Sequence, residues 1–351
     1  MVRFGRGYST SGAAFAAALP LLLLATQEAS AHVKWFCAFN LAGQPQGLEQ
    51  VLCADFEWLT GLALICLMAG CMAEGTAIGG ALLSGLDRVT ARVRLDTERL
   101  VRAVCGFFFV SLWCLGGIIL TPELKTDAGW ISWLQLAIAV SMIWRRTLPL
   151  GGLGIVFLFG FATWSYGAFH LADYPIFLGI AAYLIMTGTG RSPFGLRPLD
   201  VMRAAAAVTL MWASVEKWAF PDWTAPLLVA KPAMTLGASP ELFMRAAGVI
   251  EFTLAFALIW TPLVRRMAAI ILVAVFVSAV FEFGKLDAIG HSGIIAVLLA
   301  IAADDARQPA TRRSVVLAPA AYGAALALFL TLYYAGHAVF YGGGLGAVPV
   351  I

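Results

Sequence analysis

Apolar stretches of about 16 to 26 residues recur along the whole chain, and they constrain its fold more than any other feature. A helix of that length spans the hydrocarbon core of a bilayer, whereas a transmembrane barrel is built from shorter strands of alternating polarity. The composition agrees, because 61% of the 351 residues are hydrophobic, 12% are charged and the mean hydropathy is +0.87. The sequence therefore predicts an all-α, polytopic integral membrane helix bundle. It excludes nucleic acid as a partner, since no basic face interleaved with aromatic side chains follows a phosphate backbone.

The hydropathy pattern predicts about ten transmembrane helices. The expected spans are 56–80, 102–120, 129–144, 147–169, 175–190, 201–219, 246–262, 267–284, 289–303 and 314–340. If the first span enters from outside, every arginine after residue 31 except Arg245 lies on the cytoplasmic side, as the positive-inside rule requires. We therefore expect a multi-pass protein of a bacterial-type inner (plasma) membrane, surrounded by the lipid bilayer, with both mature termini in the periplasm.

Residues 1–31 have the organisation of a secretory signal peptide. Arg3 and Arg6 precede a short apolar core, and Ala29-Ser30-Ala31 supplies the small residues of a cleavage site. Cleavage there leaves His32 at the mature N-terminus. An uncleaved anchor is the alternative.

The central part of the chain contains an internal repeat. Residues 102–190 and 203–303 each comprise four expected helices that begin on the inner side, and Ile143-Trp144 in the first copy corresponds to Ile259-Trp260 in the second. Because both copies run in the same direction, we expect two parallel four-helix repeats related by a pseudo-twofold axis along the membrane normal. Chance similarity among apolar helices is the alternative. The predicted domains are a signal peptide (1–31), a periplasmic segment with the first span and a basic cytoplasmic extension (32–100), the first repeat (101–199), the second repeat (200–305), and a final helix with a periplasmic tail (306–351).

The two copies differ in charge. Alignment on the Ile-Trp landmark places Gln135 opposite Glu251, and alignment on the glycine late in each copy (Gly167 and Gly284) places Tyr174 opposite His291. Ionisable residues are thus concentrated in the second copy. An ionised side chain within a bilayer costs at least about 2.5 kcal/mol. We therefore expect each such side chain to have a charged or polar partner, to contact water or to serve a function.

These ionisable residues share one depth. At about 1.5 Å of rise per residue, each lies roughly 20–24 Å from its nearest cytoplasmic marker, in the outer third of the membrane. The candidate functional residues of this layer are Glu216, Glu251, Glu282 and His291, with Lys217 next to the first of them. Their convergence predicts a protonation site, a cation or metal site, or a polar pocket for a quinone head group or a small solute. Side chains that reach outward to interfacial water are the alternative.

Two short motifs in the second copy resemble those of a known family. Ser214-Val215-Glu216-Lys217-Trp218 ends one helix, and Ala247-Gly248-Val249-Ile250-Glu251 opens the next apolar helix, which ends in Arg265-Arg266. This C-terminal four-helix unit is similar to the DoxX/DoxD family of membrane proteins, and the first copy resembles a degenerate duplicate of it. The resemblance implies a role beside membrane redox chemistry, because some members are similar to subunits that pass electrons from sulfur compounds to quinone. The motif positions are Lys217 and Glu251; the doubled unit, the signal peptide and two added helices depart from the family pattern and leave the substrate open.

The histidines and two of the cysteines fall on the predicted outer side. A mature N-terminal His32 offers an amine and a ring, and together with His170 and His337 it predicts a surface site for copper or zinc. Isolated interfacial histidines are the alternative. In an oxidising periplasm, we expect Cys37 and Cys53 to form a disulfide that closes the N-terminal segment.

Three classes of function agree with these patterns. The first is a redox or quinone-linked membrane subunit with a periplasmic or membrane redox partner, in which Glu251 and Glu216 exchange protons, Lys217 balances their charge and His291 donates a hydrogen bond or acts as a ligand. The second is a transporter or metal-handling permease, which the repeat favours. The third is a non-catalytic assembly or maturation factor, which the absence of any recognisable catalytic motif favours. Whether the chain is an enzyme stays open.

Overall fold

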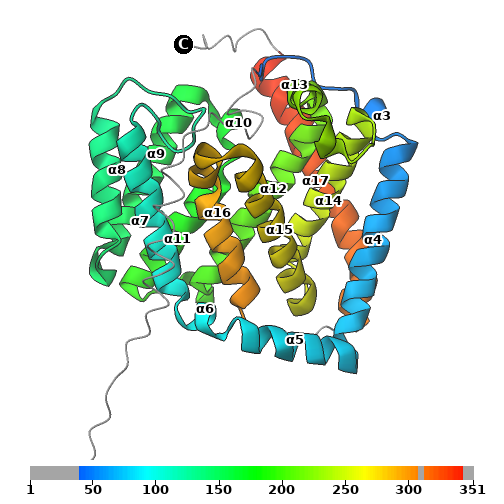
Figure 1. The fold of residues 1–351 in the computed structure, drawn as a ribbon, viewed down its shortest axis with the longest axis horizontal. Coiled ribbons are helices and arrows are strands. Elements are labelled where there is room, and N and C mark those ends of the chain that lie inside the picture. Colours follow the sequence, from blue (N-terminus) through cyan, green and yellow to red (C-terminus); the bar gives the residue numbers. More distant parts are fainter. Residues whose placement is uncertain (1–38, 307–311, 343–351) are drawn as a thin grey trace, which may run out of the picture.

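The computed structural model describes residues 39–306 and 312–342, apart from the side chains of 312 and 313. This part of the chain is helical and contains no strand (Figure 1), which confirms the predicted all-α fold. The main helices are α4 (Ala54–Glu74), α7 (Thr97–Leu115), α8 (Trp130–Ser141), α9 (Leu148–Tyr166), α11 (Pro175–Thr189), α12 (Pro198–Ala219), α14 (Pro240–Leu258), α15 (Pro262–Phe283), α16 (Lys285–Ala303) and α17 (Arg312–Tyr341). The shorter elements are α3 (Leu48–Val51), α5 (Ala77–Val89), α6 (Ala91–Leu95), η1 (Arg145–Thr147), α10 (Ala168–Leu171), η2 (Pro193–Gly195), η3 (Pro221–Trp223), α13 (Ala225–Ala230) and η4 (Pro232–Thr235).

Five helices within the described ranges are long and apolar enough to cross a membrane, as expected of a helical membrane protein. They are Ala54–Glu74, Arg145–Tyr166, Pro262–Phe283, Lys285–Ala303 and Ser314–Tyr341. Helices α12 and α14 have similar lengths, 22 and 19 residues, but they carry more charge, including Arg203 and Lys217 in α12 and Arg245 and Glu251 in α14. Charge rather than length therefore separates these two helices from the five.

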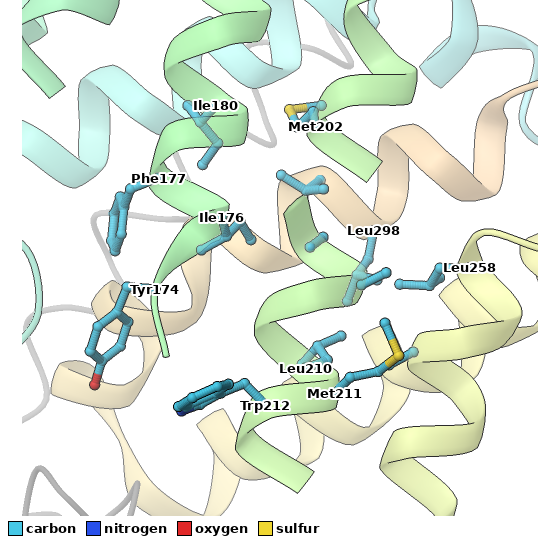
Figure 2. Packing of buried hydrophobic residues seen from close by; sticks show 14 of the residues in the cluster. Tyr174, Ile176, Phe177, Ile180, Met202, Leu210, Met211, Trp212, Leu258 and Leu298 are labelled. Atoms are coloured by element: carbon cyan, nitrogen blue, oxygen red, sulfur yellow. The ribbon is translucent and has the colours of Figure 1, made fainter. Parts of the chain in front are cut away.

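Eight helices form a closed ring in chain order. The first group consists of α7, α8, α9 and α11, and the second group consists of α12, α14, α15 and α16; each helix packs against the next one. The groups meet where α11 packs on α12 and where α16 packs on α7. Helix α4 packs outside the ring against α14, α15 and α17. Figure 2 shows part of the junction, with Ile176, Phe177 and Ile180 on α11 and Leu210 on α12.

One end of the ring, which we call the basic end, is held by ion pairs. Asp304 is buried there, and its Oδ2 lies 3.0 Å from Arg197 Nη2 and 3.4 Å from Arg265 Nη2. Arg197 also donates two hydrogen bonds to Asp200, of 2.7 and 2.8 Å, and these hold the pKa of the Asp200 carboxyl below its ordinary value of 3.8. Arg266 is 1% exposed and pairs with Asp87 of α5 at 2.6 Å. Helix α5 thereby lies across this end of the ring (Figure 1).

The predicted outer segments contact one another at the opposite end. The Gln46 amide donates to the Ala219 carbonyl oxygen at 2.8 Å, and the Tyr334 hydroxyl donates to the Gln46 carbonyl oxygen at 2.7 Å. Arg245, the exception among the arginines, pairs with Asp55 at 3.4 Å. The two ends of the ring therefore separate the same segments that the sequence assigned to the two sides of a membrane.

Local capping moves some helix ends away from their expected positions. The first expected span, 56–80, is interrupted because the Thr76 hydroxyl accepts a hydrogen bond from the Gly79 amide (3.2 Å) and starts α5. The connection between the expected spans 201–219 and 246–262 contains short helices, and α14 already begins at Pro240, capped by the Ser239 side chain. Helix boundaries thus follow caps that hydropathy does not register.

Candidate functional site

A cavity of about 100 Å³ lies between the two groups of helices. Its walls come mainly from α7, α11, α12 and α16, the four helices through which the groups meet. Phe108, Phe177 and Phe276 are among the side chains that make the wall largely apolar. Gly293 of α16 leaves the space open, since the nearest side-chain atom to a Cβ added there is Ile180 Cδ1, at 3.8 Å. The cavity is therefore an apolar space at the junction of the groups.

Lys217 and Glu251 form an ion pair at the wall of this cavity. The distance between Lys217 Nζ and Glu251 Oε2 is 2.6 Å, and the side chains are 31% and 19% exposed. Helices α12 and α14 approach closely because Gly248 has no Cβ; one added there would lie 2.2 Å from Trp218 Nε1. The same indole nitrogen donates to the Arg245 carbonyl oxygen at 3.3 Å. The two sequence motifs thus act together, because the fit of Trp218 over Gly248 brings the two charges into contact.

His291 faces the same cavity from the start of α16. Its Nδ1 lies 2.9 Å from Oδ2 of Asp287, which is completely buried one helical turn earlier. Because a carboxylate only accepts hydrogen bonds, Nδ1 carries the proton, and Nε2 is the ring atom that accepts or releases a second one. The Phe276 ring packs against the imidazole with centroids 4.8 Å apart. Asp287 Oδ1 is buried without a hydrogen-bond donor among the described residues, a cost of about 1–3 kcal/mol that indicates a functional reason for the carboxylate.

Tyr174 lines the cavity from the turn before α11. Its hydroxyl donates a hydrogen bond to Glu123, in the loop between α7 and α8. Gln135 of α8 is completely buried and holds this loop by donating to the carbonyl oxygens of Ile118 and Ile119, at 2.7 and 2.9 Å. Gln135, which aligns with Glu251, therefore fixes the backbone in the first group at the position where its counterpart forms an ion pair.

Two members of the predicted layer lie outside the cavity. Glu282 is 51% exposed and pairs with Lys231 at 2.7 Å. Glu216 is buried, but it does not line the cavity. Adjacent residues on a helix point about 100° apart, so Glu216 and Lys217 cannot both face the same space. The structure thus brings Glu251, Lys217 and His291 together and leaves Glu216 and Glu282 apart from them.

Two of the three histidines predicted to bind a metal lie within the described residues. His337 Nε2 donates to the Leu41 carbonyl oxygen at 2.8 Å, which leaves Nδ1 as the ring nitrogen that is free to bind a metal. His170 is buried beside the rings of Phe39 and Tyr166. Within residues 39–306 and 312–342, no group of three or more His, Cys, Asp or Glu side chains is arranged to hold a metal ion.

Three sequence predictions lie outside the described residues. These are the signal peptide at 1–31, the metal site that includes His32, and the Cys37–Cys53 disulfide. They stay predictions.

Sequence reasoning did not select Asp287, Asp173 or Tyr174 as cavity residues. For Asp287 the signal was present, because residues four apart on a helix share a face and Asp287 precedes His291 by that spacing. The other two follow Gly167, whose φ of 88° ends α9 and starts a new turn. Such a break cannot be read from hydropathy.

Comparison with known proteins gives no relative. No family model matches the chain, and no curated protein or solved structure matches it either. A function for the cavity must therefore be argued from its own residues.

Proposed function

We propose that this chain is a quinone-linked membrane subunit, which binds the head group of a lipid-soluble quinone in the cavity between its two groups of helices and exchanges protons with it. The observation that carries the proposal is the His291–Asp287 pair, a protonatable imidazole held by a buried carboxylate at an apolar, aromatic wall. Pockets with mostly apolar walls and a few converging polar groups suit ligands of this kind. A strongly polar solute loses more hydration on entering such a space.

The polar side chains have distinct roles in this proposal. His291 Nε2 delivers or accepts a proton, and Asp287 stabilises the imidazolium form. The Lys217 ammonium offers a second hydrogen-bond donor, while Glu251 neutralises its charge and fixes its position. The electrons come from a membrane or periplasmic redox partner. The likeness of the Lys217 and Glu251 motifs to the DoxX/DoxD family supports the same class of function.

The volume of the cavity sets a condition on the ligand. Benzene occupies cavities of about 150 Å³, so a space of about 100 Å³ admits a quinone ring only when wall side chains move. Phe177 and Phe276 are the rings that we expect to rotate.

The proposal includes ten membrane spans in two parallel repeats. A pseudo-twofold axis that exchanges the two groups places α7 on α12 and α16 on α11. The α7–α16 contact then corresponds to the α12–α11 contact, and both contacts are present. The arginine-rich basic end fits the cytoplasmic side of a bacterial-type inner membrane, which puts both mature termini in the periplasm. Reactivity of single cysteines introduced at Glu282 and Asp96 with an impermeant thiol reagent tests this orientation; we expect labelling from outside at Glu282 alone.

Quenching of tryptophan fluorescence by a short-tailed benzoquinone, titrated into the detergent-purified protein, tests the ligand. We expect saturable quenching in the wild type, an affinity at least tenfold lower in His291→Gln, and no saturation in Gly293→Leu, whose side chain fills the cavity. Gly160→Leu is the matched control, because a Cβ added at Gly160 of α9 has no atom within 4 Å apart from its chain neighbours and the backbone of its own helix. Non-saturable quenching in the wild type, equal to that of Gly293→Leu, would refute quinone binding.

One observation favours a second function, a proton-coupled permease. The cavity lies where the two groups meet, and transporters built from repeats bind their substrates at such junctions. Substrate-dependent counterflow in proteoliposomes, lost in His291→Gln, would support this function. If neither quinone binding nor counterflow occurs, a non-catalytic assembly role is the remaining one of the three predicted classes of function.

A further inference from the structure

We propose that Tyr174 and Glu123 form a second proton-exchange pair in the cavity, so that its ligand carries two oxygens on opposite edges of one ring. This inference rests on the proposed function. It narrows the quinone to a 1,4-quinone and its hydroquinone, as distinct from a 1,2-quinone, whose two oxygens lie on the same edge of the ring.

Tyr174 and His291 face the cavity from opposite sides. Helix α16 packs on α7 and α12, while α11 packs on α12 and reaches α7 through Phe177 and Phe108, whose ring centroids are 5.8 Å apart. Helices α11 and α16 therefore lie diagonally across the cavity, and Tyr174 is at the start of α11 as His291 is at the start of α16. The alignment of the two copies also places these two residues at equivalent positions.

Each of the two residues has a carboxylate behind it. Asp287 accepts from His291 Nδ1, and Glu123 accepts from the Tyr174 hydroxyl. Asp287 is completely buried, whereas Glu123 is partly exposed in the loop between α7 and α8, at the end of the ring opposite the arginines. Glu123 Oε2 is itself buried, so Glu123 is the carboxylate of the two that lies closer to the surface at that end, one side chain behind the Tyr174 hydroxyl.

The path toward the basic end is closed by apolar packing. Ala206 and Ala207 on α12 and Leu298 on α16 are completely buried, and they lie between the cavity residues and the charged residues Arg203 and Asp304 at the basic end. Protons therefore reach the cavity from the opposite end. In the proposed orientation that end faces the periplasm.

The proton balance of quinone reduction matches two pairs. Conversion of a quinone to a hydroquinone adds two electrons and two protons. The redox partner supplies the electrons, the Tyr174 hydroxyl supplies one proton, and the protonated His291 supplies the other from Nε2. Glu123 takes up a proton first and then donates it to the Tyr174 oxygen, which reverses their hydrogen bond and frees the Tyr174 hydroxyl proton for the quinone. Water returns a proton to His291.

Two probes that differ by one hydroxyl group test the second pair. 2-Decylhydroquinone and 3-decylphenol are titrated into the detergent-purified full-length protein, with tryptophan quenching as the readout. We expect the wild type to bind decylhydroquinone about tenfold more tightly, which corresponds to about 1.4 kcal/mol for one hydrogen bond. Tyr174→Phe is expected to lose this preference by weakening only decylhydroquinone.

Two further variants separate proton exchange from structure. Tyr166→Phe is the matched control, because its hydroxyl donates to the Lys125 carbonyl oxygen of the same loop (2.8 Å) but does not line the cavity; it should keep the preference. Glu123→Gln keeps an acceptor for Tyr174 but takes up no proton, so binding should persist while one titrating step disappears from its pH profile. If the wild type and Tyr174→Phe prefer decylhydroquinone over the phenol by the same factor, the second pair is refuted and the proposed function is not. A wild type that binds neither probe refutes the proposed function with it.

Discussion

Replacement of the Lys217–Glu251 pair tests whether the charges at the cavity are coupled and whether the ligand uses them. Exposed ion pairs contribute about 0.2–1 kcal/mol, and removal of one partner from a buried pair costs about 3–5 kcal/mol. With side-chain exposures of 31% and 19% and an N–O distance of 2.6 Å, this pair lies between these limits. We expect Lys217→Met and Glu251→Gln each to cost about 2 kcal/mol and the double variant to cost less than their sum, with a coupling of about 1–2 kcal/mol.

The chain contains a matched control for this cycle. Lys231 and Glu282 are the same residue types at nearly the same distance, 2.7 Å, but they are 30% and 51% exposed and lie outside the cavity. The thermal midpoint in detergent, which moves by about 2 °C per kcal/mol, measures stability, and quinone quenching measures binding. We expect the control pair to move the midpoint by less than about 2 °C and to leave binding unchanged. Equal effects of the two pairs on both measurements would refute the assignment of Lys217 and Glu251 to the site.

Three further predictions concern the framework of the site. Gly248→Ala places a Cβ against the neighbouring indole and should cost about 1–3 kcal/mol with loss of quinone binding, whereas Gly160→Ala in open space should stabilise α9 by about 0.5–1 kcal/mol; thermal midpoints and quenching check both. Arg266→Met removes the buried partner of α5 and should cost about 3 kcal/mol, whereas Arg99→Met, in an ion pair with exposures of 82% and 53%, should cost less than about 0.5 kcal/mol in the same assay. The lowered pKa of Asp200 means that its ion pairs contribute fully above about pH 4 and are lost as the pH falls through the folded-state pKa, so the midpoint advantage of the wild type over Asp200→Asn should shrink between about pH 4 and pH 3. A constant difference across that range would contradict the assignment.

Helix content and order could be predicted because hydropathy is a property of each segment alone. The expected spans at 129–144 and 175–190 lie close to α8 and α11. The same signal failed where a cap divides apolar sequence, as Thr76 does between α4 and α5. It also could not place α5 across the basic end, because that position depends on the ion pair between Asp87 and Arg266 from distant parts of the chain.

The sequence predicted how far along its helix each candidate residue lies, but not the direction in which its side chain points. Counting residues from the arginines gave a common level for Glu216, Glu251, Glu282 and His291, since the helical rise is constant. Which of these face the cavity depends on the rotation of each helix about its axis, and packing such as that of Trp218 against Gly248 determines this rotation. Glu251 and His291 both line the cavity, while Glu216 and Glu282 do not.

The carboxylates that close the basic end come late in the polypeptide. Arg94, Arg197 and Arg265 are all synthesised before Asp304 and Asp305, with which they pair at 3.2, 3.0 and 3.4 Å. During biosynthesis these guanidinium groups therefore wait without those counterions until the last helix of the ring has emerged from the ribosome. A chain that stops short of residue 304 therefore leaves all three guanidinium groups without these carboxylates.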